Sequence, residues 1–366
     1  MKVAKLYSFN DIRVEDVPVP ETGPGDALMK TKASGICSGD VMPWYIEKKA
    51  PLVLGHEPSG EIVAVGKNVK SLMAGDRVFV HHHAPCLECR HCRRGDHVQC
   101  ETWKNTKIIP GGISEYILIP EINLKNDTLK LPEHVSFEDG TLVEPTACVV
   151  KGLKRAGFGF QNPSLIPPLL RGDNEGVEEN DFSFFRKTVL VIGLGVMGQL
   201  NILVAKRFGA VRIIGADMVQ YRLQKAKDLG ADNVIDVSRE NLVSSLKKIT
   251  NGDMADLVIV GPNSVEAMQE GLSAAGAGGT VLFFTPAKLG EKLLIDPNDL
   301  YFKDINIITS YSCGPVETRE ALMLIEEGVV NAEKLVTHRF PIERTAEAFR
   351  LTAEAKDSLK VLITFE

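Results

Sequence analysis

The sequence has no long hydrophobic run and no strong excess of charge. No stretch of about 18 apolar residues is present to span a bilayer, and the first residues, MKVAKLYSFNDIRVEDVPVP, lack the apolar core of a signal peptide. The 42 basic and 48 acidic side chains give a net charge of −6, and such a surface does not attract phosphate backbones or anionic lipid. We therefore expect a cytoplasmic protein that has neither nucleic acid nor a membrane as a partner.

The cysteines do not suggest a disulfide framework. Seven is an odd number, and four of the seven lie within residues 86–100. In a reducing compartment such crowding favours metal binding over disulfide formation. Disulfides are not needed for stability either, because 366 residues, at about 150 per domain, suggest two domains with sizeable cores.

Two patterns of hydrophobicity divide the chain. Up to residue 150 the apolar runs are short and separated by Gly and Pro turns, which predicts a β-rich half. From Thr188 apolar strands alternate with helical stretches, which predicts βαβ units around a parallel sheet. The final segment predicts a helix and a closing strand that return to the first domain. The expected strands are 61–65, 77–80, 115–119, 189–192, 211–216, 257–260, 280–284 and 360–365, and the expected helices are 198–208, 221–229 and 317–327.

Residues 158–187 separate the two patterns and follow neither. They contain three prolines, an acidic run and a late aromatic cluster. We interpret the segment as a solvated linker or surface loop, peripheral to the chemistry. The alternative is a lid or a subunit contact that uses Phe182, Phe184 and Phe185.

The four crowded cysteines have the spacing of a metal site. Cys86, Cys89, Cys92 and Cys100 form Cys-x2-Cys-x2-Cys-x7-Cys, which lets a short loop surround one Zn²⁺ with four thiolates. Four thiolates also suit an iron–sulfur cluster, and buried free thiols are a further possibility. A closed four-thiolate site has no open position for a substrate, so we predict a structural zinc ion.

A second group of possible metal ligands is dispersed along the first half. It comprises Cys37 in SGICSGD, His56 and Glu57 in LGHEPSGE, and Glu144 in LVEPTAC. Thiolate, imidazole and carboxylate are the ligand types of a catalytic zinc ion, which keeps one exchangeable position. Each residue alone also has an ordinary structural interpretation, as a small buried thiol, a core histidine or a helix start. Spacing does not decide between the two interpretations.

A glycine-rich segment, VLVIGLGVMG, predicts dinucleotide binding. Gly193, Gly195 and Gly198 form G-x-G-x-x-G between a predicted strand and a predicted helix, with Val196 and Met197 inside the motif. The glycines permit a tight turn and the approach of a pyrophosphate to the helix N-terminus, where free amides favour negative charge. The alternative is a glycine turn that only packs the helix on the strand.

An acidic residue follows the second strand of this region. Asp217 lies 19 residues beyond Gly198, near the distance at which an acid meets the adenosine ribose 2′-hydroxyl. A carboxylate there would repel a 2′-phosphate, even with Arg222 five residues further on. We therefore expect NAD rather than NADP.

These motifs together resemble a known enzyme family. The order of GICSGD, GHEPSGEIVAVG, the four-cysteine lobe, LVEP, GLGVMG and KVLITF is similar to that of the zinc-dependent medium-chain alcohol dehydrogenases, in particular their polyol and sorbitol branch with its threonine dehydrogenase neighbours. The resemblance covers nearly the whole chain except residues 158–187. It implies an α/β protein in which a GroES-like β-rich catalytic domain, residues 1–157 and 313–366 with the zinc lobe at 86–100, flanks a Rossmann domain with a doubly wound parallel sheet at 188–312.

The resemblance also assigns roles to residues. By position, Cys37, His56 and Glu144 match the ligands of the catalytic zinc ion, and Glu57 matches a glutamate that approaches the metal when water leaves. Asp40 matches the acid that orients the zinc histidine. A carboxylate at position 144, where liver-type enzymes have cysteine, is similar to the polyol branch.

One position departs from the family pattern. The family has Ser or Thr two residues after the zinc cysteine, a hydroxyl that passes on the substrate proton, whereas this chain has Gly39. Ser38 is the nearest replacement, but adjacent residues of an extended chain point to opposite sides. We therefore predict that Glu57 or a histidine among residues 81–83 carries the proton through water.

Six further residues have weaker signals. Lys360 matches a basic residue that meets the cofactor pyrophosphate in the family, or is simply a surface lysine. The histidines at 81–83 either line the substrate cleft or form a solvated turn. Cys148 and Cys313 are expected to be small core fillers.

The activity implied by the resemblance is the reversible oxidation of a secondary alcohol, in a polyol or sugar-like molecule, to a ketone, with hydride passing to NAD⁺. Two zinc ions per chain and a homo-oligomer, dimer or tetramer, are also implied. An L-threonine 3-dehydrogenase and a simple secondary-alcohol dehydrogenase are the nearer alternatives. A non-enzymatic nucleotide-binding protein that kept only the fold is the remote one.

Overall fold

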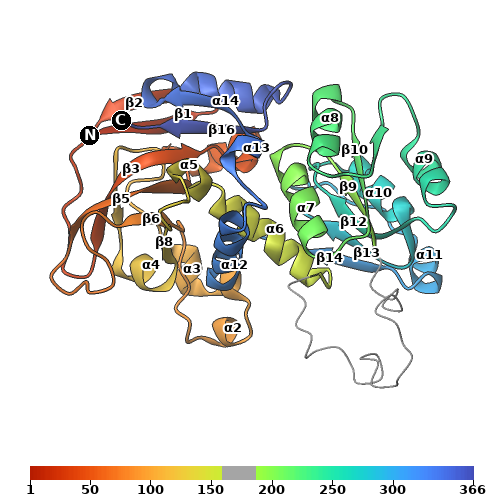
Figure 1. The fold of residues 1–366 in the computed structure, drawn as a ribbon, viewed down its shortest axis with the longest axis horizontal. Coiled ribbons are helices and arrows are strands. Elements are labelled where there is room, and N and C mark those ends of the chain that lie inside the picture. Colours follow the sequence, from red (N-terminus) through yellow and green to blue (C-terminus); the bar gives the residue numbers. More distant parts are fainter. Residues whose placement is uncertain (159–186) are drawn as a thin grey trace. The chain divides into compact units, whose positions relative to one another are not determined.

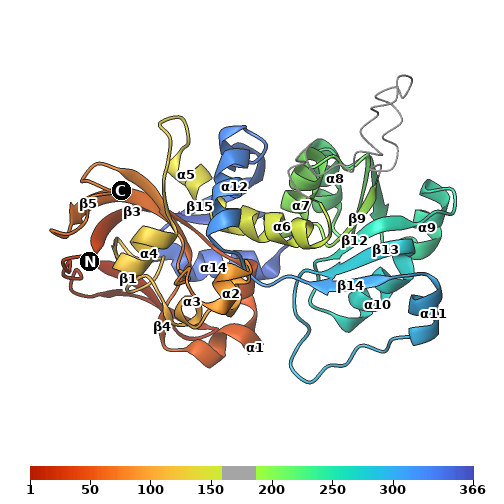
Figure 2. The ribbon, with the colours of Figure 1, turned by 90° about the horizontal axis from the view of Figure 1, so that it is seen from below.

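The computed structural model describes residues 1–158 and 187–366 and divides the chain into two compact units. Unit 1 comprises Met1–Cys148 and Ser312–Glu366, and unit 2 comprises the described residues of Val149–Tyr311. The expectation that residues 158–187 form a linker, a lid or a subunit contact falls almost entirely on 159–186, outside the described residues. Figures 1 and 2 show the elements of both units.

Unit 1 is built around a largely antiparallel sheet. Its strand order is β15-β16-β3-β5-β6-β8, with β7 paired to β3, and β15 and β16 are the one parallel pair among these described strands. A smaller sheet has the order β2-β1-β4. The strands are β1 (Lys2–Ser8), β2 (Asp11–Asp16), β3 (Ala27–Gly35), β4 (Leu52–Val53), β5 (Glu57–Val65), β6 (Arg77–Val80), β7 (Tyr116–Ile119), β8 (Thr128–Lys130), β15 (Val336–Pro341) and β16 (Lys360–Thr364).

The C-terminal segment completes this sheet. Strand β16 pairs with β3, where Leu362 lies opposite Gly35. Helix α14 (Thr345–Glu354) packs on the same region, because Phe349 belongs to a buried cluster with Ile36 and Ile363. This core fixes the segment that follows β3, which carries one of the expected metal ligands.

The helices of unit 1 are short apart from three. Helix α6 (Val143–Arg155) carries the chain from unit 1 into unit 2, and α12 (Pro315–Glu326) and α14 follow its return. The remaining helices are α1 (Pro43–Ile46), α2 (Arg90–Arg93), α3 (Glu101–Asn105), α4 (Glu121–Asn126), α5 (Phe137–Gly140) and α13 (Ala332–Leu335), with 3-10 turns at Ser38–Val41, Glu47–Lys49, His97–Gln99 and Ile342–Arg344.

Unit 2 is a doubly wound parallel sheet. Its strand order is β11-β10-β9-β12-β13-β14, and every pair is parallel. From the central strand β9 the chain first adds β10 and β11 on one side and then β12, β13 and β14 on the other. This is the dinucleotide-binding topology, so the predicted α/β fold class is confirmed. Figure 2 shows α7 and α8 on one face of the sheet and α10 on the other. The strands are β9 (Thr188–Ile192), β10 (Arg212–Asp217), β11 (Asn233–Asp236), β12 (Ala255–Val260), β13 (Ala275–Phe283) and β14 (Asn306–Thr309), and the helices are α7 (Val196–Arg207), α8 (Gln220–Asp228), α9 (Leu242–Ile249), α10 (Val265–Ala274) and α11 (Pro297–Phe302).

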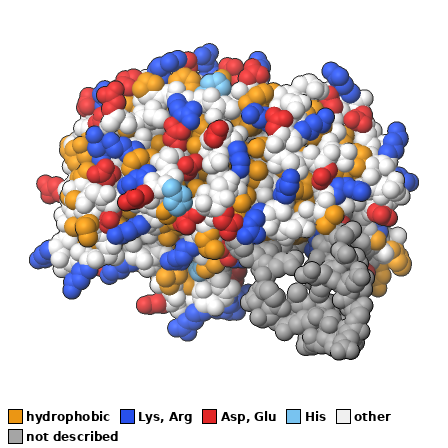
Figure 3. All heavy atoms as spheres, in the orientation of Figure 1, with side chains coloured by type: hydrophobic (Ala, Val, Ile, Leu, Met, Phe, Trp, Pro, Cys, Tyr) orange, Lys and Arg blue, Asp and Glu red, His pale blue; other side chains and the backbone are white. Residues whose placement is uncertain are grey.

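The surface shows no separation of charge on the face drawn in Figure 3, where basic and acidic side chains are interspersed. Within residues 1–158 and 187–366, no helix combines the length and the apolar character that crossing a membrane requires.

Candidate functional site

The four-cysteine lobe brings its sulfur atoms together. The Sγ atoms of Cys86 and Cys92 are 3.9 Å apart, those of Cys89 and Cys92 are 3.6 Å apart, and those of Cys86 and Cys100 are 3.6 Å apart. Four thiolates at about 2.3 Å from one tetrahedral zinc ion would be about 3.8 Å from each other. The lobe therefore fits a single zinc ion.

Backbone amides of the lobe point at the same sulfur atoms. The amides of Glu88 and Cys89 donate to Cys86 Sγ at 3.5 and 3.3 Å, and the amide of Cys86 donates to Cys100 Sγ at 3.4 Å. Burial opposes the ionisation of Cys100, but backbone hydrogen bonds from Cys86 and Trp103 help to lower its pKa to about 6. Such donors favour the thiolate form that a metal requires.

A second set of ligand atoms lies where β3 and β5 meet. Gly35 at the end of β3 lies opposite Glu57 at the start of β5, so Cys37 and His56, just outside the two strands, come close together. The candidate ligand atoms of Cys37, His56 and Glu57 lie within 4.8 Å of one another. A thiol, an imidazole and a carboxylate at this separation suit a zinc ion with an exchangeable position.

Cys37 and His56 are each held by a neighbour. Cys37 caps the 3-10 helix Ser38–Val41, where its Sγ accepts from the Gly39 amide at 3.3 Å. His56 Nδ1 lies 3.1 Å from Oδ2 of the buried Asp40, which leaves Nε2 as the ring nitrogen free to bind a metal. Burial opposes protonation of His56, but the charges of Asp40 and Cys37 outweigh it and raise the pKa well above its ordinary value.

Glu57 is paired with a lysine that comes from the end of the chain. The Nζ of Lys360 on β16 pairs with Glu57 Oε2 and also donates to the carbonyl of Ile36 at 3.2 Å. Both side chains are 1% exposed, so the alternative of a surface lysine at position 360 is wrong. Burial raises the pKa of Glu57, and the charge of Lys360 opposes that rise.

Glu144 lies in a neighbouring group. At the start of α6 its carboxylate is within 4.8 Å of ring nitrogens of His81 and His82, and it also lies within that distance of the thiols of Cys148 and Cys313. It is not in the compact set that contains Cys37, His56 and Glu57. The structure thus brings Glu57, more closely than Glu144, to the cysteine and histidine of the expected zinc site.

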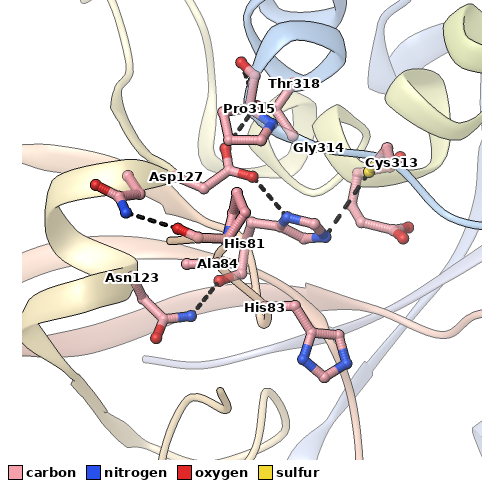
Figure 4. Close-up of polar contacts among 12 residues, drawn as sticks. His81, His83, Ala84, Asn123, Asp127, Cys313, Gly314, Pro315 and Thr318 are labelled. Atoms are coloured by element: carbon pink, nitrogen blue, oxygen red, sulfur yellow. Dashed lines mark hydrogen bonds and ion pairs between the residues drawn. The ribbon is translucent and has the colours of Figure 1, made fainter. Parts of the chain in front are cut away.

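His81 does not lie in a solvated turn. His81 is 0% exposed, and its Nδ1 lies 2.7 Å from Oδ2 of Asp127. The His82 ring centroid is 4.8 Å from that of His56, whereas His83 Nδ1 lies 2.6 Å from the carbonyl of Thr106. The solvated-turn alternative is therefore wrong for His81, because the chain buries its ring beside a carboxylate. Figure 4 shows this arrangement.

Sequence reasoning missed Asp127 and Thr318. The Thr318 hydroxyl donates to Asp127 Oδ1 at 2.6 Å, and both residues are buried. No spacing pattern links them, since they lie 191 residues apart. The available signal was weak, because Thr318 is simply a polar residue in the first turn of the predicted helix 317–327.

The backbone at Ser38 differs from the extended chain that the sequence predicts there. The chain is extended at Cys37, with φ −79° and ψ 141°, but it turns into a 3-10 helix at Ser38. The alternation of an extended strand therefore does not apply beyond Cys37. Ser38 remains partly exposed.

The glycine-rich loop of unit 2 has the shape expected for a phosphate-binding turn. Gly193 has φ +85°, and a Cβ there would lie 2.8 Å from Pro262 Cδ; a Cβ at Gly198 would collide with the Gly193 carbonyl oxygen. A Cβ at Gly195 would meet nothing within 4 Å among the described residues. Gly195 also caps α7 without a side-chain hydrogen bond. The open space beside uncapped amides fits a cofactor pyrophosphate.

Asp217 connects the end of β10 to this loop. Its Oδ2 accepts from the Leu194 amide at 2.7 Å, and its Oδ1 accepts from the amides of Met218 and Val219 at 2.7 and 2.9 Å. Arg222 Nη1 lies 3.7 Å from Oδ2. The carboxylate is therefore fixed in place beside the glycine loop, at the strand end where the sequence predicts it. Within the same loop, Val196 is buried and Met197 half-buried.

Comparison with known proteins identifies the family. The profile described as Alcohol dehydrogenase GroES-like domain matches residues 23–133, and that described as Zinc-binding dehydrogenase matches residues 196–327. Sorbitol dehydrogenase of Ovis aries is 32% identical over 98% of this chain and 94% of its own length. L-threonine 3-dehydrogenase of Rhizobium etli (strain CIAT 652) is 31% identical over 92% of this chain and 90% of its own length.

A solved structure shares the fold. The NADP-bound structure of a protein from Sinorhizobium meliloti 1021, described as a zinc-binding dehydrogenase, has a TM-score of 0.83 at 25% identity and covers 100% of this chain and 99% of that one. The chain therefore belongs to the zinc-dependent medium-chain dehydrogenases. It is an oxidoreductase that uses zinc and a nicotinamide cofactor, and the predicted family and enzyme class are confirmed.

The contact between β3 and the Glu57–Lys360 pair predicts that Gly35 cannot be enlarged. A Cβ at Gly35 would lie 2.6 Å from Lys360 Cε and closer still to the Glu57 carboxylate. Because such overpacking costs about 1–3 kcal/mol, Gly35→Ala should lower the free energy of unfolding by that amount, measured by chemical denaturation. Gly39→Ala is the matched control, since its Cβ would meet only Cys37 Sγ at 3.6 Å. Equal stability of the two variants would contradict the close packing.

Proposed function

We propose that this enzyme oxidises a secondary alcohol of a polyol or sugar-like molecule to a ketone, and catalyses the reverse reaction, with NAD as the hydride carrier. The observation that carries the proposal is the convergence of Cys37, His56 and Glu57 on one point of unit 1. The similarity to sorbitol dehydrogenases supports a polyol substrate. The similarity to L-threonine 3-dehydrogenases keeps that activity as the second candidate, because the identities are nearly equal, 32% and 31%.

We infer that Cys37 and His56 hold the catalytic zinc ion, with Glu57 and Glu144 as the two carboxylates available to it. When bound, zinc supplies Lewis acidity, which lowers the pKa of a hydroxyl group at the open position. Asp40 orients the His56 ring through its contact with Nδ1. Lys360 pairs with Glu57 away from solvent, and its positive charge compensates the charge of the buried carboxylate. This pairing keeps the Glu57 carboxylate beside Cys37 and His56.

The four-cysteine lobe is proposed as the structural zinc site. Its donor set is all sulfur, and the sulfur separations of 3.6–3.9 Å suit one ion better than an iron–sulfur cluster, which spreads its ligands around several metal atoms. Two zinc ions per chain follow from these two assignments.

The nicotinamide cofactor is proposed to bind the loop of unit 2 with its pyrophosphate at Gly195 and the start of α7. Asp217 would accept a hydrogen bond from the adenosine ribose, and its negative charge favours NAD. NADP is the alternative, since the Sinorhizobium meliloti structure holds NADP and Arg222 lies beside Asp217. A contact of Lys360 with the pyrophosphate remains a prediction, and Lys360 already has Glu57 as its partner.

Unit 1 is proposed as the catalytic domain and unit 2 as the coenzyme domain. A cytoplasmic location and a homo-oligomeric state, dimer or tetramer, are proposed from the family resemblance alone. No observation favours a non-enzymatic nucleotide-binding protein, because the donor set and the glycine loop both remain intact.

The proposed function is tested by following cofactor reduction with zinc-loaded enzyme across polyols, inositols, threonine and simple secondary alcohols. A polyol should give the highest kcat/KM, because a hydroxyl-rich substrate fits the polyol branch of the family. Fastest turnover of threonine would establish the second candidate instead.

Removal of one lobe cysteine should separate the two zinc roles. Cys100→Ser should lower both thermal stability and zinc content, because a structural site contributes to folding. Glu144→Ala should leave the fold intact and reduce turnover. Arg93→Ser, at an exposed position of the same lobe, is the control that should change neither property. Elemental analysis that finds one zinc ion per wild-type chain, or iron with a cluster absorbance, would contradict the assignment.

The preference for NAD should depend on Asp217. Asp217→Ser removes the charge that would face a 2′-phosphate, so it should narrow or reverse the NAD preference, measured as the ratio of kcat/KM for the two cofactors. Asp228→Ser, an exposed change at the far end of α8, controls for loss of charge. A wild-type ratio that already favours NADP⁺ would overturn this prediction.

Proton release should not depend on a hydroxyl near Cys37. Ser38→Ala should reduce kcat by less than about tenfold, whereas Glu57→Gln should cost considerably more, because general acid–base assistance is typically worth about 10²–10⁴. The test is kcat against pH for both variants, with thermal denaturation to detect any loss of the Glu57–Lys360 pair. A large Ser38→Ala defect that high pH rescues, with Glu57→Gln near wild type, would identify the serine as the relay.

A further inference from the structure

Two cysteines that the proposed function does not use lie side by side near Glu144. Cys313 is fully buried and Cys148 is partly buried. Their Sγ atoms, together with a carboxylate oxygen of Glu144, lie within 4.8 Å of one another. Cys148 Sγ donates to Glu144 Oε1 at 3.4 Å, and Cys313 Sγ lies 3.9 Å from the Glu144 carbonyl oxygen. Both thiols therefore contact polar atoms of Glu144.

The surroundings of Cys313 are polar and ordered. His81 Nε2 lies 3.7 Å from Cys313 Sγ, and the other ring nitrogen faces Asp127. The Thr318 hydroxyl holds the second oxygen of Asp127 at 2.6 Å. Figure 4 shows the His81 ring lying between Asp127 and Cys313. The imidazole is thus fixed with one nitrogen directed at a thiol, a position from which it can exchange a proton with that thiol.

The two cysteines lie at the points where the chain leaves unit 1 and where it returns to it. Cys148 is the last residue of unit 1 before the chain enters unit 2, and Cys313 is the second residue after the chain returns. A covalent bond between them would therefore close a loop that contains all of unit 2. The residues lie 165 positions apart in the sequence, so only the fold brings the thiols together.

We propose that Cys148 and Cys313 are a redox-active pair that hydroperoxides convert into a reversible disulfide. In the first step, one thiol sulfur takes the terminal oxygen of a hydroperoxide, ROOH, and becomes a sulfenic acid while ROH leaves. In the second step, the other sulfur attacks that sulfenic sulfur, the S–S bond forms, and its proton leaves with the sulfenic oxygen as water. The two thiols lose two electrons in total, and the hydroperoxide gains them.

The oxidised pair would alter the surroundings of Glu144. In the reduced state the Cys148 thiol donates a hydrogen bond to the Glu144 carboxylate. A disulfide sulfur has no proton to donate, and formation of the bond draws the Cys148 side chain toward Cys313. Oxidation of the two thiols would therefore remove one hydrogen bond from Glu144, which is one of the two carboxylates proposed for the catalytic zinc ion.

The test treats the zinc-loaded full-length protein with hydrogen peroxide and then blocks free thiols by alkylation under denaturing conditions. The expected product carries alkyl groups on five of its seven cysteines and contains one disulfide-linked peptide pair, which joins Cys148 to Cys313 and disappears on treatment with dithiothreitol. Cys148→Ser and Cys313→Ser should each abolish the linked pair, and the remaining thiol should stop at the sulfenic acid or be oxidised further. The linked pair is measured in the wild-type protein, so this result stands even if neither variant folds.

Two results would overturn the proposal. One is a linked pair drawn only from the zinc lobe, with Cys148 and Cys313 still alkylated as free thiols. The other is that both thiols resist peroxide until a chelator is added. That result would show that Glu144, Cys148 and Cys313 hold a metal ion instead. Both readouts are peptide masses, so neither depends on the alcohol that the enzyme oxidises.

Discussion

The packing of unit 1 around the end of β3 depends on one buried ion pair. Glu57 and Lys360 are each 1% exposed and contact each other directly, and two charges removed from water in this way must remain paired. The partners are 303 residues apart, so the pair forms only when β16 returns from the end of the chain. It also requires glycine at position 35, because the carboxylate and the lysine stem occupy the space of a Cβ.

The proposed metal-ligand set lies beside this pair. Gly35 and Glu57 lie opposite each other in the β3–β5 ladder, and the residues just beyond the strand ends, Cys37 and His56, are carried to the same point. Asp40, one turn after Cys37, then fixes the His56 ring. In unit 2 a different carboxylate has the corresponding role, because Asp217 accepts backbone amides from both β10's end and the glycine loop. A buried carboxylate thus lies at each site: Glu57 pairs with Lys360 in unit 1, and Asp217 accepts hydrogen bonds from backbone amides in unit 2.

The parts predicted from sequence were those encoded within a short stretch. The four-cysteine lobe spans 15 residues, so spacing alone implied the convergence that the sulfur distances show. The strand, glycine turn and helix from Thr188 to Arg207 are also local, and their apolar pattern located them to within about two residues. The parallel sheet followed from the alternation of strands and helices.

The parts that sequence could not supply depend on long-range pairing. Glu57 and Glu144 are both acids beside other ligand-type residues, and only the fold shows that Glu57 is the nearer to Cys37 and His56. The burial of His81 against Asp127 depends on the approach of the segments that follow β6 and α4, which lie 46 residues apart in the sequence. The same fold brings Cys148 to Cys313. Burial of Lys360 likewise depends on a strand pairing that no local pattern encodes.

The proposed function requires the enzyme to transfer a hydride directly from an alcohol carbon to a nicotinamide ring. The most direct measurement uses the secondary alcohol that gives the fastest cofactor reduction, deuterated at its carbinol carbon, and determines by mass spectrometry where the deuterium goes. Direct transfer predicts that the reduced cofactor carries the deuterium and the ketone product has lost it. Unlabelled reduced cofactor with deuterium released to water, or no reduction with any alcohol, would contradict the proposed function.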